Sequence, residues 1–186
     1  MTDDPTPLPT ATNVHHIGVT VPDLDEAVGF FTDCLGAREL YRKGPFGDDG
    51  DAMERRLGVH PDATASLAML RLGPTANLEL FEWDAPDADG ETPRLSDTGA
   101  THIGIQVDDV DEATAAVEAR DDATVLDQPR TNGSGPTAGM RYVFFRTPWG
   151  GYVELVEEPD GMPYTEESDD RLYGSAPSWS HRPDGE

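Results

Sequence analysis

The chain has 186 residues, and 37 acidic against 13 basic side chains give it a formal net charge of −24. This balance argues against a nucleic-acid-binding protein, because such proteins neutralise phosphates with Lys and Arg. A charge of this size opposes a compact state in dilute buffer, but salt at about 1 M screens it within roughly 3 Å. The composition therefore suggests a halophilic protein.

No apolar run approaches the roughly 20 residues of a membrane span, and the first residues are acidic and rich in Pro and Thr. The single cysteine, Cys34, cannot form an internal disulfide, and we expect it to fill a buried apolar position. These features predict a cytoplasmic protein with no membrane partner.

The first predicted unit is a strand followed by an amphipathic helix. Residues 16–21 alternate between aliphatic and other side chains, as in a half-buried strand. Asp23 and Glu26 then form an N-cap and capping-box pattern, and apolar residues follow at helical spacing as far as Gly36. The helix is therefore expected to pack its apolar stripe on one face of a sheet.

The same pattern returns 86 residues later. His102 aligns with His16 without a gap, and Asp109 and Glu112 repeat the helix-start pattern. A shared period of this kind indicates an internal duplication. After each helix, three further strands are expected, at residues 37–43, 66–72 and 77–83 in the first half and at 123–128, 140–145 and 151–157 in the second. Residues 44–64 are an insert with a helical turn that only the first half carries.

The predicted fold class is α+β, with two tandem βαβββ modules that form a curved mixed sheet around a metal-binding cavity. The expected organisation is a flexible N-terminus at 1–12, a first module at 13–83, a linker at 84–98, a second module at 99–158 and an acidic tail at 159–186.

Strand alternation predicts which side chains face the cavity. The aliphatic set of each first strand must face its helix, which sends His16 and His102 to the other side. In the last strands the same argument places Glu79 and Glu154 inside. Two imidazoles and two carboxylates are suitable ligands for Zn, Ni, Co, Mn or Fe. His15 is not expected to be a ligand, because its parity matches the helix-facing set and the repeat has Thr at its place.

The paired sequences HIGVTVPDLDEA and HIGIQVDDVDEA and the closing strands LELFE and YVELVE resemble the vicinal oxygen chelate superfamily. This superfamily includes glyoxalase I, methylmalonyl-CoA epimerase, extradiol ring-cleaving dioxygenases and bleomycin or fosfomycin resistance proteins. The resemblance covers about residues 13–158, and it places the metal ligands on His16, Glu79, His102 and Glu154. It implies a metal-dependent lyase, isomerase or epimerase that works through an enediolate, with Glu154 as the first choice of base and Glu79 as the second.

Two other functions are consistent with the sequence. An Fe(II) ring-cleaving dioxygenase needs two His and one carboxylate, although an extra inward Glu would crowd its open position. A non-catalytic, ligand-sequestering protein is the third possibility. We expect a small-molecule substrate and a homodimer. The residues expected to contact the substrate are Thr20, Phe81, Gln106, Tyr142 and Arg141.

Overall fold

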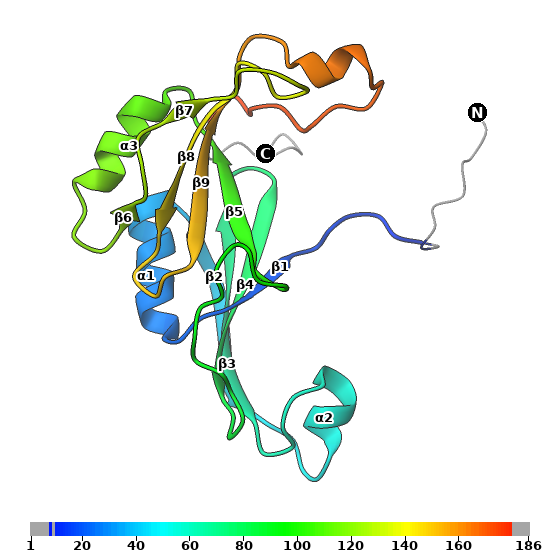
Figure 1. Ribbon diagram of the computed structural model, residues 1–186. Helices are drawn as coiled ribbons and strands as arrows, with labels where there is room; N and C mark the ends of the chain where they lie inside the picture. The colour runs from blue at the N-terminus through cyan, green and yellow to red at the C-terminus, as the bar shows by residue number, and fades with distance from the viewer. Residues whose placement is uncertain (1–7, 9, 180–186) are drawn as a thin grey trace.

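The computed structural model describes residue 8 and residues 10–179 (Figure 1). The first module contains β1 (Ile17–Thr20), α1 (Leu24–Leu35), β2 (Arg38–Phe46), α2 (Ala52–Leu57), β3 (Thr64–Leu72) and β4 (Ala76–Asp84). The second contains β5 (His102–Gln106), α3 (Val110–Glu118), β6 (Thr124–Val125), β7 (Arg130–Thr131), β8 (Arg141–Arg146) and β9 (Tyr152–Glu157), and a 3-10 turn follows at Pro163–Glu166.

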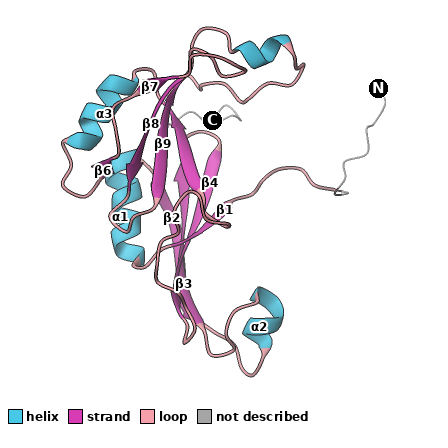
Figure 2. Ribbon diagram, viewed as in Figure 1, coloured by secondary structure: helices cyan, strands magenta, loops and turns pink. Residues whose placement is uncertain are grey.

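Each module forms its own sheet. The strand orders are β1-β4-β3-β2 and β5-β9-β8-β6, with β7 paired to β8 (Figure 2). In both sheets the first strand runs parallel to the last, and the remaining pairs are antiparallel. The α+β class and the duplicated βαβββ order are thus confirmed, but one chain forms two sheets rather than one continuous curved sheet.

The strand expected at residues 123–128 is wrong in length, since only Thr124–Val125 pairs with β8. Asp127 accepts a hydrogen bond from the backbone N–H of Gln128, and Pro129 has no N–H to donate to a ladder. The chain therefore leaves the sheet and returns only for the short strand β7. Within the insert, the expected helical turn is present as α2.

Both main helices begin where the sequence predicts. Asp23 accepts a hydrogen bond from the N–H of Glu26 at 2.8 Å, and Asp109 accepts one from Glu112 at 2.9 Å. Gly36 ends α1 in the left-handed region, with φ of 63°. These caps satisfy backbone groups that a helix leaves without internal partners.

Helix α1 belongs to both halves of the hydrophobic core. Leu24, Ala27 and Phe31 pack on the aliphatic face of the first sheet. Phe30, one residue outside the predicted stripe, packs with Phe145 in the second core cluster. The helix-facing sides of both sheets therefore turn toward one shared apolar interior.

Trp149, in the turn between β8 and β9, strengthens this packing between modules. Its ring centroid lies 5.6 Å from that of Phe30 and 5.9 Å from that of Phe31. Arg120, just after α3, adds a guanidinium 5.8 Å above the Phe30 ring. In Figure 1, α1 and α3 accordingly lie on the same side of the strands.

The segment after β9 is held to the modules at a few points. Trp179 donates a hydrogen bond from Nε1 to the carbonyl of Gly36 at 3.3 Å, and the backbone N–H of Tyr164 donates one to the carbonyl of Pro136 at 3.0 Å. The side chains of Leu172 and Tyr173 are exposed. Trp179 and Tyr164 are therefore the points at which this segment is held to the modules. No helix in the described part of the chain is long and apolar enough to cross a membrane.

Candidate metal centre

The first pair of candidate ligands lies on neighbouring strands of the first sheet. His16 immediately precedes β1, and Glu79 is the partner of Gly18 in the parallel pairing of β1 with β4. The imidazole Nε2 lies 3.0 Å from a carboxylate oxygen of Glu79. Both side chains point away from the face on which Leu78 and Leu80 are buried, as strand alternation requires.

The second sheet repeats this arrangement. His102 opens β5, Glu154 is paired with Gly104 across β5 and β9, and the His102 Nε2 lies 3.2 Å from a carboxylate oxygen of Glu154. The two imidazoles are 35% and 42% exposed, while the carboxylates are 18% and 17% exposed. Each carboxylate therefore sits deeper than its histidine, and the ring edge remains open to solvent.

Glycine keeps the space beside each pair free. Gly18 and Gly104 occupy the strand position two residues after each histidine, on the same face. A Cβ at Gly18 would meet nothing within 4 Å, and one at Gly104 would lie 4.0 Å from a carboxylate oxygen of Glu154. A larger side chain at Gly104 would therefore project over the carboxylate of Glu154.

The donor chemistry of each pair suits a divalent cation. Two ligand atoms that are each about 2.1 Å from a metal, at 90–109° to one another, are separated by about 3.0–3.4 Å. The observed separations of 3.0 and 3.2 Å fall in this range. Each sheet thus presents half of the predicted ligand set in a suitable arrangement.

The four residues do not converge within one chain. Among residues 8 and 10–179, no group of three or more His, Cys, Asp or Glu side chains is placed to hold a metal ion. Within one chain the two sheets turn their aliphatic faces, not their histidine faces, toward the common core.

Comparison with known proteins gives the family. A model of the glyoxalase/bleomycin resistance protein/dioxygenase superfamily matches residues 13–161. The chain belongs to this superfamily. A 2-epi-5-epi-valiolone epimerase from an Actinomyces species is 48% identical over 176 residues, covering 94% of this chain and 96% of that one. The uncharacterised protein YaeR from Escherichia coli K12 is 27% identical over 150 residues, covering 78% of this chain and 95% of that one.

Solved structures agree on the fold. A glyoxalase family protein from Bacillus cereus has a TM-score of 0.62 at 20% identity, covering 82% of this chain and 98% of that one. Glyoxalase I from Leishmania major has a TM-score of 0.52 at 24% identity, covering 84% of this chain and 91% of that one. The recognition made from the paired HIG motifs is thus confirmed.

His15 is closer to the site than its strand parity suggested. It lies before β1 rather than within it, so alternation does not fix its direction. Its Nδ1 is 2.7 Å from the Nδ1 of His16, and its carbonyl accepts a hydrogen bond from Asn77 at 2.9 Å. A proton on the His16 Nδ1 would leave the lone pair of Nε2 available to a cation, and the contact with His15 would then orient the ring.

The second glutamate of each closing motif has a structural role. Glu82 accepts a hydrogen bond from the N–H of Leu24, the first residue of α1, at 2.7 Å. Glu157 accepts one from the N–H of Val110, the first residue of α3, at 2.8 Å. Each motif therefore sends one carboxylate to the candidate site and the other to a helix N-terminus.

Four of the five expected substrate contacts share the faces of the histidine–glutamate pairs. Thr20 and Phe81 are paired on the first sheet, and Gln106 and Tyr142 are both paired with Val156 on the second. Arg141 shares the parity of the buried Val143 and Phe145. The guanidinium of Arg141 is held by Asp111 at 2.8 Å and by Glu157 at 3.3 Å, so Arg141 lies on the wrong face of β8 for the expected contact.

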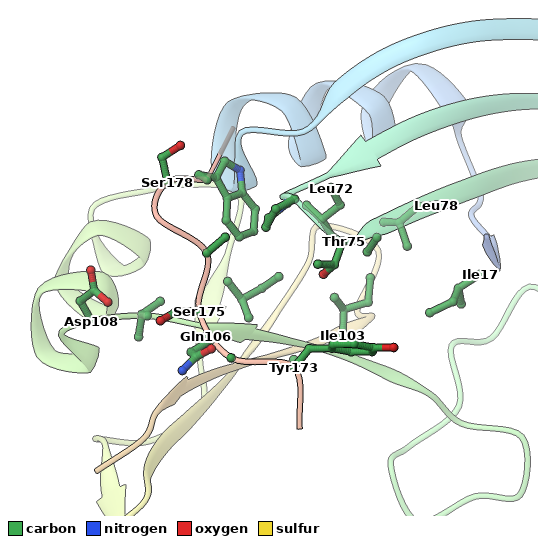
Figure 3. Close-up of a pocket in the computed structure, with 18 of the residues that line it drawn as sticks. Ile17, Leu72, Thr75, Leu78, Ile103, Gln106, Asp108, Tyr173, Ser175 and Ser178 are labelled. Atoms are coloured by element: carbon green, nitrogen blue, oxygen red, sulfur yellow. The ribbon is translucent and has the colours of Figure 1, made fainter. Parts of the chain in front are cut away.

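A separate cavity of about 640 Å³ lies between the modules on the aliphatic side (Figure 3). Ile17 and Leu78 line it from the first sheet, Ile103 lines it from the second, and the chain segment 173–179 crosses it. His102 and Gln106 also line this cavity, whereas His16, Glu79 and Glu154 do not. The cavity therefore adjoins the second half of the candidate metal centre.

Proposed function

We propose that this protein is a metal-dependent epimerase that inverts a carbon next to the carbonyl of a small, hydroxylated ketone. The observation that carries this proposal is the 48% identity, over nearly the full length of both chains, to a 2-epi-5-epi-valiolone epimerase. That compound is accordingly the first candidate substrate. The two equivalent histidine–glutamate pairs supply the residues that the chemistry needs.

Epimerisation requires a proton to leave a carbon and to return on its other face. Glu154 is our first choice of base, and Glu79 is the second. Carboxylates on opposite sides of the substrate would allow one to remove the proton and the other to return it. A divalent cation bound by the histidines and glutamates would supply the positive charge that stabilises the enediolate.

The neighbours of the pairs favour an uncharged substrate. Thr20, Gln106 and Tyr142 offer neutral hydroxyl and amide groups on the two site faces. Arg141, which could have met an anionic group, is occupied by two carboxylates on the other face of the sheet. Hydroxyl groups of a ketone polyol match neutral hydrogen-bonding partners of this kind.

The test is metal analysis of protein purified in about 2 M KCl, followed by an epimerase assay with 2-epi-5-epi-valiolone. We expect Zn, Ni, Co, Mn or Fe in the protein, activity that a chelator removes and metal restores, and loss of activity in Glu154→Gln. Glu157→Gln is the control, since Glu157 faces α3 and not the site. Full activity in Glu154→Gln would refute its role as base. Oxygen uptake with a catechol would indicate a dioxygenase, and a protein without metal or turnover would indicate a sequestering role.

A further inference from the structure

Another cavity, of about 620 Å³, lies between β1, the segment that joins the two modules, and the turn before β9. Gly18 and Thr20 line it from the first module, and His102 lines it from the second. Residues 88–93 of the joining segment form part of its wall. The cavity therefore adjoins one half of the candidate metal centre, and its size suits a small organic molecule.

Thr147, in the turn between β8 and β9, lines this cavity with a hydroxyl group that lacks a partner. The residue is 6% exposed, and no described residue forms a hydrogen bond with its Oγ1 atom. Its backbone N–H does donate one to the carbonyl of Gly151 at 2.9 Å, so the turn itself is bonded. Because a buried hydroxyl without a partner lowers stability, such a group needs an explanation, and a ligand contact supplies one.

The indole N–H of Trp149 lies beside the same space. A Cβ built on Gly151 would be 3.0 Å from Thr147 Oγ1 and 2.9 Å from Trp149 Nε1. The indole ring packs on aromatic side chains of α1, yet no residue in the described part of the chain accepts a hydrogen bond from Nε1. A ligand oxygen near Gly151 can therefore accept from the indole N–H and share a hydrogen bond with the hydroxyl of Thr147.

The joining segment forms an acidic wall that is fixed to the turn. The Thr92 hydroxyl donates a hydrogen bond to the carbonyl of Trp149 at 2.7 Å. Asp89 and Glu91, from the same segment, line the cavity. Their carboxylates would repel an anionic ligand, because like charges at close range raise the free energy of the complex.

The basic residue that precedes the turn does not counter this charge. Arg146 is not among the residues that line the cavity. Its guanidinium donates a hydrogen bond to the Tyr152 hydroxyl at 2.6 Å and lies 4.7 Å above the Tyr152 ring. The polar groups offered to a ligand at the turn are thus a hydroxyl and an indole N–H, which suit an uncharged hydroxyl group.

We propose that this cavity binds a neutral, polyhydroxylated small molecule, one hydroxyl of which is held between Thr147 Oγ1 and Trp149 Nε1. Gly151 keeps the position open, because any side chain there would press on both atoms. The inference rests on the proposed function in one respect, namely that the ligand is the hydroxylated ketone on which the metal centre would act. His102, which lines the same cavity, connects the two sites.

The experiment follows the indole N–H signal of Trp149 in ¹H–¹⁵N spectra of the metal-loaded protein. Its signal is identified by its loss in Trp149→Phe. The ligand titrated is 2-epi-5-epi-valiolone, with spectra recorded after any inversion has reached equilibrium, and cyclohexanone serves as a ring ketone without hydroxyl groups. Thr147→Val keeps the branched shape and removes the hydroxyl, while Thr147→Ser keeps the hydroxyl and is the matched control.

The Trp149 signal should shift with 2-epi-5-epi-valiolone and not with cyclohexanone. The apparent Kd should rise about 5- to 10-fold in Thr147→Val and stay close to the wild-type value in Thr147→Ser. Without ligand, Thr147→Val should melt no lower than the wild-type protein, because it loses a buried hydroxyl that has no protein partner. A Thr147→Val variant with unchanged Kd would assign the hydroxyl to a buried water only, and an unshifted Trp149 signal in the wild-type protein would likewise overturn the site.

These outcomes differ from those that would refute the proposed function. Inversion of 2-epi-5-epi-valiolone with the same Kd in the wild-type protein and in Thr147→Val would overturn the hydroxyl site and leave the epimerase intact. A shifted Trp149 signal and weaker binding to Thr147→Val, without any inversion by the wild-type protein, would support the site and overturn the epimerase.

Discussion

Glu79 and Glu82 are three residues apart on β4 but are expected to respond differently to substitution. Glu82 accepts the hydrogen bond of the Leu24 N–H at 2.7 Å, and that N–H has no partner within α1. A hydrogen bond to a charged group contributes about 1.5–3 kcal/mol. Glu82→Ala should therefore lower the free energy of unfolding by about 2 kcal/mol, and Glu82→Gln, which keeps an acceptor, by about 1 kcal/mol.

For a chain of this length, 1 kcal/mol corresponds to about 2–4 °C in the melting temperature. Glu82→Ala should thus melt about 4–8 °C lower than the wild-type protein, with its metal content unchanged. Glu79→Gln should show the opposite result, with metal lost and the melting temperature of the metal-free protein unchanged. Thermal unfolding by circular dichroism after chelation, combined with metal analysis before it, measures both. If Glu82→Gln lost metal as Glu79→Gln does, the assignment of the two carboxylates to opposite faces would be refuted.

Four further predictions follow from the geometry. His15→Ala removes the group that orients His16 and should weaken metal binding by about 10- to 100-fold, with partial recovery in His15→Gln; unchanged affinity in a metal titration would exclude the orienting role. Gly104→Val should abolish activity by covering Glu154 and change the free energy of unfolding by no more than about 0.5 kcal/mol; an active variant would show that this space is not used. Burial raises the pKa of the Cys34 thiol above its ordinary value, so less thiolate is present near neutral pH in the folded protein. Iodoacetamide should therefore label the folded protein more slowly than the urea-unfolded protein, and the difference should narrow only when the pH exceeds the raised pKa; equal rates at neutral pH would show that the thiol is not shielded. The melting temperature should rise between about 0.1 and 2 M KCl as the net charge of −24 is screened, and a flat profile would contradict the halophilic interpretation.

The sequence predicts the parts of this structure that local chemistry determines. Strand alternation correctly places Glu79 on the face of β4 opposite to Leu78 and Leu80, and His16, one residue before β1, lies beside Glu79 as predicted. The Asp23 cap also forms as expected, because its partner is only three residues away. Because the second module repeats the first, the same reasoning predicts the Asp109 cap and the His102–Glu154 pair.

Contacts between distant residues were harder to predict. Alternation gives the face of a side chain within its own sheet, but it carries no information on how two sheets are placed relative to each other. Two residues in the sequence could have indicated how the two sheets pack. Phe30 is an aromatic residue outside the apolar stripe of its helix, and Trp149 belongs to the TPWGG turn; the ring of Phe30 contacts both Phe31 and Trp149. The helix-capping role of Glu82 likewise depends on a contact across 58 residues.

The face of Arg141 could have been predicted from the sequence. Val143 and Phe145 follow it at intervals of two and form the apolar set of β8, so the same alternation argument sends Arg141 to the helix side. The direction of the His15 side chain, by contrast, could not be predicted from the sequence. Alternation applies only within a strand, and β1 begins two residues after it.

The most direct test of the proposed epimerase is proton exchange in D₂O. The metal-loaded protein is incubated with 2-epi-5-epi-valiolone, and proton NMR follows both inversion and deuterium incorporation at the carbon next to the carbonyl. Deuterium should enter the product at the inverted carbon, chelation should stop both processes, and Glu154→Gln should be inactive while Glu157→Gln is active. Inversion without incorporation of solvent deuterium, or at an unchanged rate after metal removal, would contradict it.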